Sequence, residues 1–458
     1  MCGIVGYSGP KEPLPILING LSRLEYRGYD SAGIAISDGN KITIEKKEGK
    51  LDVLKDHLKN NQMSGNVGIG HTRWATHGIP NDVNAHPHSD NNEEFAIIHN
   101  GIIENYAEIK KDLLKEGFEF KSDTDTEVVA VELSRKWSGE LLKTVVDVAN
   151  SLEGTYALLV TTTKEEGTIV AGRLMSPLVL GVGDDEVFLA SDSAAILEHT
   201  KKMIFLENGD FVEIKNGKYK LFDSDLNEIE REIQEIDWEV SEAEKSGYDH
   251  FMYKEILEQS EVIERTISGR LDTNSDDIPI MSDHASKFEK IWIVACGTAY
   301  HAGLFGKDLF EKVLGVPVSV ELASEFRYRE PIVGKNDLGI VISQSGETMD
   351  TIAATELLKE NGSHVLALVN VVGSSLARMA DSVFYLHVGP EIGVASTKAY
   401  LGMLVSQLVL AKHWDSKNRL DVSFDEIAEL PNLIDKTMAC EDQIKEISEK
   451  IYKKNDIY

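Results

Sequence analysis

The chain opens with MCGIVGYSG, residues 1–9, in which a cysteine at position 2 precedes an apolar β-type run, Gly3–Tyr7. Removal of Met1 would leave Cys2 carrying both a thiol and a free α-amine. An α-amine titrates near about pH 8, so a useful fraction is neutral and can accept the thiol proton. Cys2 is therefore a candidate nucleophile with its own base, although a lone cysteine is usually inert. The segments that follow decide between these interpretations.

Four later segments carry the other groups that acyl transfer to a thiol requires: HTRWATHG (71–78), NAHPH (84–88), HNGIIENY (99–106) and SDTDTE (122–127). Asn100 and Gly101 can supply an amide and a backbone N–H to an oxyanion, although an isolated Asn-Gly pair is typical of a tight turn. Arg73 matches a carboxylate with its planar fork, and Asp125 can bind an ammonium. Taken singly, Arg73 is more typical of a surface ion pair, and Asp125 is more typical of the cap of a helix.

The first 220 or so residues are rich in short strand-like runs, with helices expected at about 103–117 and 126–138. Many strands with few helices favour a layered α+β domain with stacked sheets. The expected strands are Gly3–Tyr7, Ala32–Ser37, Val67–Gly70, Phe95–His99, Tyr156–Thr161 and Val187–Ala190.

After His250 five apolar strands alternate with helices, which predicts a mostly parallel sheet covered on both faces. The helices are expected at about 299–314, 348–361, 374–380 and 398–413, and 425–455 reads as helical. The last three residues resemble the start of another strand. The five strands are Ile291–Ala295, Val318–Glu321, Leu338–Ser343, Val365–Asn370 and Val383–Val388.

SQSGET, residues 343–348, lies between the third of these strands and a helix. Unpaired N–H groups and the helix dipole favour an anion at such a place, and hydroxyls add donors without adding net charge. An acidic protein could bind a phosphate monoester locally in this way. A Ser/Thr segment that merely caps the helix is the alternative.

Together these segments closely resemble the glutamine–fructose-6-phosphate aminotransferase (isomerizing) family. The resemblance continues through ACGTAY (295–300), ASEFRYR (323–329), SQSGET and EIGVASTK (391–398). It implies an α+β glutaminase domain of the N-terminal-nucleophile type with layered sheets, followed by an α/β parallel-sheet sugar-isomerase (SIS) domain that binds phosphosugars. It also implies that ammonia released from glutamine passes to fructose 6-phosphate, which yields glucosamine 6-phosphate and glutamate.

The resemblance assigns roles residue by residue. Cys2 is the nucleophile, and Asn100 with Gly101 forms the oxyanion hole. The tryptophan at position 74 gates the passage of ammonia. Where the family commonly has serine after Cys-Gly-Thr, this chain has Ala299, so one hydroxyl contact to the sugar is missing or replaced. The implied glutamine-binding residues are Arg73, Trp74, Thr76, His77 and Asp125, and the implied phosphosugar-binding residues are Thr298, Ser343, Gln344, Ser345, Thr348, Val394 and Ser396.

The expected domains follow the motifs and the composition. Residues 2–221 form a type-2 glutamine amidotransferase domain, 222–249 an acidic solvated linker, 250–285 a helical connection, 286–425 the first SIS domain and 426–458 the start of an incomplete second one. Family members continue beyond the position of Tyr458, and the proton shuttle and imine-forming lysine of the sugar step belong to that continuation. Glutaminase and synthase activities are therefore expected to separate in this chain.

Composition excludes several partners. A net charge of −30 and a pI near 4.8 argue against nucleic acid and anionic membranes. Three widely spaced cysteines fit neither a disulfide framework nor a metal site, and Cys296 reads as a buried strand-end residue. The histidines at 71, 77, 86, 88 and 99 lack ligand spacing, so no metal and no cofactor are expected. We expect a cytoplasmic homodimer.

Four other interpretations bear on the same motifs. An asparagine synthetase would need an S-G-G-x-D-S loop, and an amidophosphoribosyltransferase an acidic pair before a Thr/Gly phosphate loop; the sequence contains neither. A non-catalytic sugar-phosphate sensor would have no need for a nucleophile with its own oxyanion hole. A fragment with glutaminase activity alone remains open.

Overall fold

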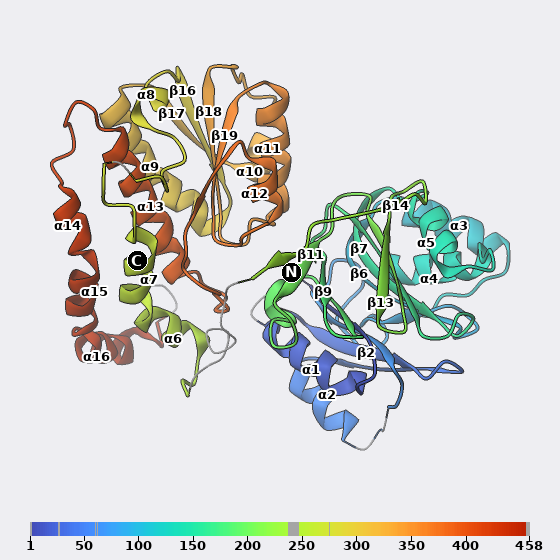
Figure 1. Ribbon diagram of the computed structural model, residues 1–458. Coiled ribbons are helices and arrows are strands. Elements are labelled where there is room, and N and C mark those ends of the chain that lie inside the picture. The colour runs from blue at the N-terminus through green and yellow to red at the C-terminus, as the bar shows by residue number, and fades with distance from the viewer. Residues whose placement is uncertain are drawn as a thin grey trace. The chain divides into compact units, whose positions relative to one another are not determined.

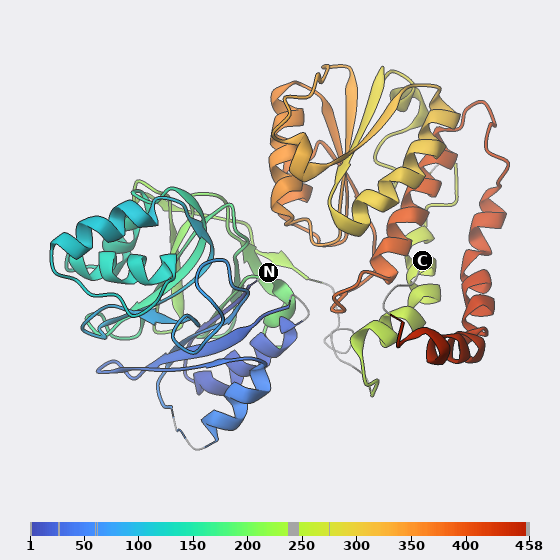
Figure 2. The ribbon, with the colours of Figure 1, turned by 180° about the vertical axis from the view of Figure 1, so that it is seen from behind.

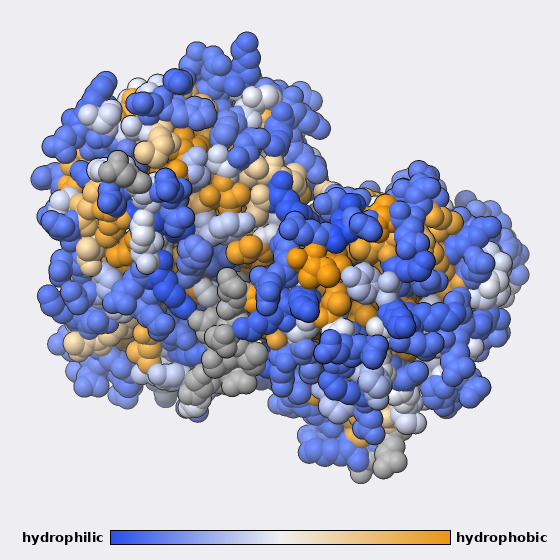
Figure 3. All heavy atoms as spheres, in the orientation of Figure 1, coloured by the Kyte–Doolittle hydropathy of each residue, from blue (hydrophilic) through white to orange (hydrophobic). Residues whose placement is uncertain are grey.

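The computed structural model describes residues 2–25, 28–59, 61, 63–236, 247–273 and 275–454. The chain divides into two compact units, residues 1–243 and 244–458, and each is described by itself (Figure 1). The face seen in Figure 3 is mostly hydrophilic, as the acidic composition leads one to expect. Within the described ranges, no helix combines the length and apolar character that a membrane span requires.

The first unit contains two sheets in which every printed pairing is antiparallel. One has the strand order β15-β11-β9-β10-β1-β4-β2-β3 and the other β14-β13-β12-β8-β7-β6-β5. The strands of the first sheet are β1 Gly3–Ser8, β2 Ser31–Ser37, β3 Ile42–Glu48, β4 Val67–Arg73, β9 Val179–Val182, β10 Val187–Ala190, β11 Lys202–Phe205 and β15 Gln234–Glu235. Those of the second are β5 His88–Ser89, β6 Phe95–Ile103, β7 Gly154–Thr162, β8 Thr168–Leu174, β12 Phe211–Lys215, β13 Lys218–Phe222 and β14 Glu228–Ile229.

The side chains of β1 alternate between two apolar cores, which shows how the layers of the unit are arranged. Ile4 points into the apolar core between the two sheets, whereas its neighbour Val5 points into a second core beneath the helices. Both side chains are fully buried. Helices α1 (Pro13–Arg23) and α2 (Leu51–Leu58) cover the first sheet, and α4 (Asp125–Arg135) and α5 (Leu141–Ala149) cover the second. The unit is thus a four-layer α+β sandwich, and all six predicted strands are present (Figure 2).

The acidic stretch after residue 221 differs from the predicted solvated linker. Its residues 228–235 contribute a short strand to each sheet, β14 beside β13 and β15 beside β11. Arg231 donates two hydrogen bonds to the buried carboxylate of Asp210, at 3.0 and 2.8 Å, and Ile236 is buried. The prediction was wrong here because this segment pairs with strands β13 and β11, and composition does not reveal such partners. Residues 237–246 of the expected linker lie outside the described residues.

The second unit contains a parallel sheet with the strand order β17-β16-β18-β19-β20. Every predicted strand is present: β16 Lys290–Ala295, β17 Val318–Leu322, β18 Asp337–Ser343, β19 His364–Val369 and β20 Ser382–Tyr385. Helices α7 (Gln259–Ile267), α9 (Gly297–Leu314) and α13 (Lys398–Trp414) pack on one face. The other face is covered by α10 (Ala323–Phe326), α11 (Met349–Glu360) and α12 (Ser375–Met379).

Strand order fixes where this sheet can bind a ligand. The chain leaves β16 toward β17 on one side and then returns to β18 on the other, so the connections diverge between β16 and β18. Open α/β sheets bind ligands at the carboxyl ends of the strands at such a switch point. Ala295 of β16 pairs with Ile342 of β18, so the segments containing Thr298 and SQSGET leave the same edge.

The helical prediction for 425–455 is confirmed in outline but not in continuity. The structure has three helices there, α14 (Phe424–Ala428), α15 (Leu430–Met438) and α16 (Glu441–Ile451). The expected connection at 250–285 contains α6 (Phe251–Leu257), α7 and α8 (Ser282–Ala285). The strand suggested for the last three residues lies outside the described residues. The remaining elements of the first unit are α3 (Tyr106–Lys115) and the short η2 (Ser193–Ala195).

Candidate active site

Cys2 lies at the start of β1, beside the end of β4. Its Sγ accepts a hydrogen bond from the backbone N–H of Trp74 at 3.2 Å. The register explains this contact, because Gly3 pairs with Thr72 and the antiparallel strands continue outward from that pair. Burial raises the pKa of the Cys2 thiol, and the Trp74 N–H acts in the opposite direction. The indole of Trp74 is 55% exposed, so this residue contributes its backbone to the cysteine while its side chain faces outward.

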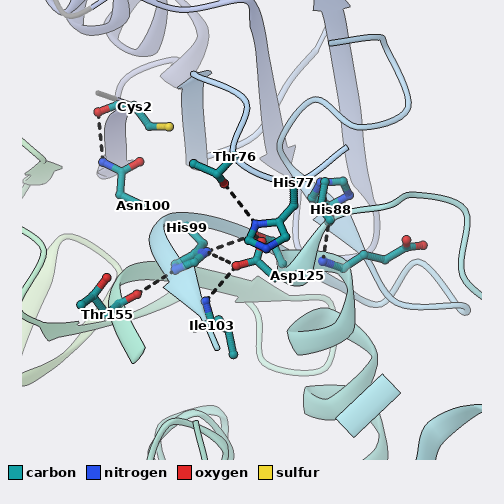
Figure 4. Close-up of polar contacts among 12 residues, drawn as sticks. Cys2, Thr76, His77, His88, His99, Asn100, Ile103, Asp125 and Thr155 are labelled. Carbon is teal, nitrogen blue, oxygen red and sulfur yellow. Dashed lines mark hydrogen bonds and ion pairs between the residues drawn. The ribbon is translucent and has the colours of Figure 1, made fainter. Parts of the chain in front are cut away.

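Asn100 approaches Cys2 from the second sheet. Its Nδ2 donates to the carbonyl oxygen of Cys2 at 3.2 Å (Figure 4). Its Oδ1 lies 2.9 Å from Nε2 of His71, and the same nitrogen lies 3.1 Å from the carbonyl oxygen of His99. Because both of these oxygens are acceptors, we infer that Nε2 of His71 carries the hydrogen. His71 therefore orients the Asn100 amide with its NH₂ group toward Cys2.

Gly101 lies within β6, which overturns the interpretation of the Asn-Gly pair as a tight turn. Its φ is 131°, in the region that favours glycine. A Cβ at this position would lie 2.0 Å from the carbonyl oxygen of Thr155 on the neighbouring strand β7. The close approach of the two backbones thus explains the need for glycine here.

Arg73 is buried, which excludes the surface ion pair. Its guanidinium donates to the backbone oxygens of His77 and Gly78, the latter at 3.2 Å. Burial lowers its pKa, while the charges of Asp30, Cys2 and Asp125 act to raise it. Arg73, Cys2 and Asp125 therefore share one electrostatic environment.

Asp125 lies at the first turn of α4, and the residue that caps this helix is Thr124. The Thr124 hydroxyl accepts the N–H of Glu127 at 3.3 Å. Asp125 Oδ2 instead accepts the N–H of Ile103 at 2.9 Å, and it lies 4.0 Å from Nδ1 of His99 (Figure 4). The carboxylate is thereby held at the end of β6, the strand that carries Asn100 and Gly101.

Thr76 and His77 lie on the segment between Arg73 and β5. The Thr76 hydroxyl is 3.3 Å from Nδ1 of His77. The His77 ring packs edge-on against Tyr106, with 5.1 Å between ring centroids. The carbonyl oxygen of His77 also accepts a hydrogen bond from the Arg73 guanidinium, and Figure 4 shows the His77 side chain on the side of Asp125.

Four buried histidines surround this site in neutral form. Burial lowers the pKa of His71 to about 3 and lowers those of His86, His88 and His99 as well. The rings of His71 and His86 are stacked, with 4.3 Å between centroids. Among the described residues no group of three or more His, Cys, Asp or Glu is arranged to hold a metal ion. These histidines act as hydrogen-bonding and packing groups.

The phosphosugar candidates lie on the parallel sheet of the second unit. The hydroxyls of Ser343 and Thr348 are 2.9 Å apart, and Ser343 Oγ also accepts the N–H of Gly346 at 3.1 Å. Ser345 Oγ accepts the N–H of Glu347. Within this described segment no side chain caps α11, because Thr348 is directed to Ser343. The N–H groups of the first turn of α11 are therefore left without a side-chain acceptor, as an anion site requires.

Asn370, at the end of β19, ties the SQSGET loop to the segment that leads to EIGVASTK. Its backbone N–H donates to the carbonyl oxygen of Gln344 at 3.2 Å. Its side chain donates to Gly389 O at 2.7 Å and accepts the N–H of Val388 at 2.9 Å. Two loops that are about 45 residues apart in the sequence are thus joined through the backbone and the side chain of one residue.

A glutamate orders the second loop that carries phosphosugar candidates, EIGVASTK (391–398). Glu391 accepts hydrogen bonds from Ser396 Oγ at 2.9 Å and from the N–H of Thr397 at 2.8 Å. Val394 is 79% exposed at the tip of the loop. Thr298, in the first turn of α9, is exposed, whereas Ala299 packs into the apolar core, so its methyl group takes part in packing.

The structure also shows the surroundings of Lys398 and Cys296, two residues to which no ligand contact is assigned. Lys398 is buried and forms an ion pair with Glu258, with 2.7 Å between Nζ and Oε2. Cys296 is only partly buried at the end of β16, and burial raises the pKa of its thiol. Cys296 thus lies at the end of a strand, as predicted, but it is less buried than predicted.

The sequence did not single out three of these residues. His71 stands out in the sequence only as a possible metal ligand, and Asn370 and Asp30 carry no motif. Asp30 accepts the N–H of Ala75 and the hydroxyl of Ser31. These residues act through hydrogen bonds to loops distant in sequence, and no local pattern signals such contacts.

Two family models match the chain: a glutamine amidotransferase domain over residues 56–245 and a SIS domain over residues 285–412. The glutamine–fructose-6-phosphate aminotransferase [isomerizing] of Clostridium tetani is 46% identical over 468 aligned positions, which cover all of this chain and 77% of that protein. The protein of the same name from Thermococcus kodakarensis is 44% identical with the same coverage.

Among solved structures, the C-terminal domain of glucosamine-fructose-6-phosphate aminotransferase from Francisella tularensis matches 45% of this chain and 61% of its own. The identity is 36% and the TM-score 0.39.

Sandwich, parallel sheet and family models together define a glutamine amidotransferase of the N-terminal-nucleophile type, joined in one chain to a sugar-isomerase domain. The sequence identity of 44–46% to the two relatives, over all of this chain, defines a narrower family than the domain models do. The chain belongs to the glutamine–fructose-6-phosphate aminotransferase (isomerizing) family.

Proposed function

We propose that this chain hydrolyses glutamine at Cys2 and directs the ammonia to fructose 6-phosphate, which yields glutamate and glucosamine 6-phosphate. The observation that carries the proposal is the placement of Cys2 against the Trp74 N–H and the Asn100 amide, with that amide oriented by His71. A cysteine that merely stood near the end of the chain, without a catalytic role, would not need an oriented amide beside it.

The residues of the site take distinct parts in the reaction. After removal of Met1, the α-amine of Cys2 accepts the thiol proton, and the thiolate attacks the side-chain amide carbon of glutamine. Asn100 Nδ2 and the Gly101 N–H stabilise the oxyanion of the tetrahedral intermediate. The protonated α-amine then returns its proton to the leaving nitrogen, so ammonia departs and a thioester forms. Water, deprotonated by the same amine, releases glutamate and restores the thiol.

Arg73 and Asp125 anchor the amino-acid end of glutamine in this proposal. The buried guanidinium binds the α-carboxylate, with Thr76 and His77 nearby, and Asp125 binds the α-ammonium. Trp74, which is 55% exposed and whose backbone N–H donates to the Cys2 thiol, lies on the path by which ammonia leaves. Oppositely charged anchors in one buried environment select an amino-acid zwitterion over a simple amide.

The second unit binds the sugar phosphate in the same proposal. The phosphate lies at the start of α11 against Ser343, Gln344, Ser345 and Thr348, where uncapped N–H groups support it. Thr298, Val394 and Ser396 contact the sugar from the neighbouring loops. The limits of the two activities are part of the proposal: the first lies in residues 2–236, which include β14 and β15, and the second in residues 286–425, with 426–458 beginning a second SIS domain.

The proposal extends to the compartment, the oligomeric state and the macromolecular partners of the enzyme. The cysteines at positions 2, 296 and 440 form no disulfide among the described residues, which suits the reducing cytoplasm. A homodimer is supported by Tyr328 and Ile332, which expose 74% and 94% of their surface in the single chain. A net charge of −30 disfavours nucleic acid and anionic membranes as partners. Sedimentation of the purified chain tests the dimer.

Substitution of the nucleophile tests the function directly. Cys2→Ala should abolish glutamate release from glutamine, with glucosamine 6-phosphate quantified in the same reaction. Cys440→Ala is the control, because Cys440 is an exposed thiol of the second unit. Normal glutamate release by folded Cys2→Ala protein would show that the nucleophile lies elsewhere.

A further inference from the structure

Lys46 of β3 holds together the loop that precedes β5. Its Nζ donates to three backbone carbonyl oxygens, those of Val83 at 3.0 Å, Ala85 at 2.7 Å and Pro87 at 3.1 Å. Alternate carbonyls of residues 83–87 thus converge on one ammonium group. An ammonium carries three donors, and all three are used.

The fit between β3 and this loop is close. Gly33 of β2 pairs with Lys46, and a Cβ on Gly33 would lie 2.2 Å from the carbonyl oxygen of His86 and 2.6 Å from Cβ of Lys46. The loop therefore rests on the strand at the point where the lysine leaves it. Its position depends on β3, a strand that contributes no candidate substrate contact.

Asn84 lies in the middle of the segment that Lys46 holds. Its Nδ2 donates to Ile79 O at 3.0 Å, and its Oδ1 accepts the N–H of Asp123 at 3.0 Å. A Cβ on Gly78 would lie 2.6 Å from the same Nδ2. Asn84 thus touches the turn that receives the Arg73 guanidinium on one side and the start of the Asp125 helix on the other.

We propose that Lys46 is a positioning residue for glutamine binding: by fixing residues 83–87 it fixes Asn84, which sets the spacing of Arg73 and Asp125. The inference rests on the proposed function, because it assigns these two anchors to glutamine. Lys46 itself does not contact the substrate. Its effect falls on affinity for the amino-acid end and not on the chemistry at Cys2.

The charge state of Lys46 supports this role. Burial lowers its pKa to about 8, and Lys121 and Arg73 act in the same direction, while Glu127 and Asp82 oppose them. A neutral amine has two donors in place of three. One of the three carbonyls would then lose its partner as the pH rises through the pKa of Lys46.

The test measures glutamine binding by calorimetry in the Cys2→Ala background, where turnover does not interfere. Lys46→Met keeps most of the length of the side chain and removes its donors. It should weaken binding roughly 10- to 100-fold, which is about the contribution of one hydrogen bond to a charged group. Lys46→Arg, which retains charge and several donors, should restore most of the affinity. Lys50→Met, at an exposed lysine just beyond β3, is the control and should bind as the parent does.

A pH series separates positioning from a general structural role. The ratio of glutamine affinities, parent to Lys46→Arg, cancels the titration of glutamine itself. It should fall as the pH rises through about 8, because arginine stays charged. Unchanged affinity in folded Lys46→Met protein, or a ratio independent of pH, would overturn the inference. Turnover in Cys2→Ala would instead overturn the proposed function.

Discussion

His71 offers the sharpest test of how Asn100, on the second sheet, is oriented toward Cys2, the proposed nucleophile. Its Nε2–H serves both Asn100 Oδ1 and His99 O, at 2.9 and 3.1 Å. His71→Met retains an unbranched side chain of similar reach but has no donor. His71→Gln places an amide NH₂ near the position of Nε2, so the two variants differ mainly in one hydrogen-bonding group.

Two effects of different size are expected from His71→Met. Two buried acceptors lose their donor, which costs about 1–3 kcal/mol of stability for each. The Asn100 amide is also free to rotate, and loss of an oxyanion donor typically lowers kcat by about 10²–10³-fold. His71→Gln should keep kcat much closer to that of the parent, because its NH₂ still fixes the amide.

The assay is steady-state glutamate release, with the folded fraction of each variant determined from urea unfolding. Alkylation of Cys2 by iodoacetamide reports whether the thiol itself is unchanged. If His71→Met is folded and turns over glutamine at the parental rate, Asn100 does not depend on His71. Equal losses in the methionine and glutamine variants would mean that the imidazole ring, and not its donor, is needed.

Three further outcomes follow from the geometry. Gly101→Ala should lower the urea midpoint of the first unit strongly, because its Cβ would lie 2.0 Å from Thr155 O. Gly117→Ala, at a residue with positive φ but open space around it, should cost only about 1 kcal/mol of stability. Similar midpoints for the two variants would contradict this reasoning. Alanine at Ser343, Ser345 and Thr348 together should weaken calorimetric binding of fructose 6-phosphate, by about 1.5–3 kcal/mol per lost contact to the phosphate, and unchanged affinity would move the site. The first unit should lose stability below about pH 6.5, by about 1.4 kcal/mol per pH unit for each buried histidine, because the unfolded chain takes up protons there and the folded one does not. Equal urea midpoints at about pH 7.5 and 5.5 would refute that reasoning. The histidines concerned are His71, His86, His88 and His99, whose pKa values burial lowers.

Much of the architecture could be predicted because its strands are long apolar runs. β10 begins and ends at the predicted residues, and β1 differs from its prediction by one residue. The two-residue strands β14 and β15 could not be predicted, since each exists only through a partner strand. A sequence window contains no information about that partner.

The candidate site, like the fold, has one part that the sequence predicts and another that it does not. The motifs brought Cys2, Arg73, Asn100, Gly101 and Asp125 to attention, and the structure places Cys2 beside Asn100. The groups that hold these residues were missed, because their roles depend on which way a ring or an amide faces. Lys46 illustrates this well: within EKKEGK it reads as one of several solvated charges, and only the fold reveals three carbonyls around it.

The place of β1 within its sheet has a consequence for synthesis of the protein. β1 is the first strand to be made, yet its two neighbours are β4 and β10, which end at residues 73 and 190. At translation rates of about 5–20 residues per second, the second neighbour follows the first strand by roughly 10–40 s. During this interval the amino terminus is not yet enclosed by its sheet, so a processing aminopeptidase can reach it. Ribosome-bound chains ending before residue 187 should therefore have their first residues open to such enzymes, while longer nascent chains should progressively protect them.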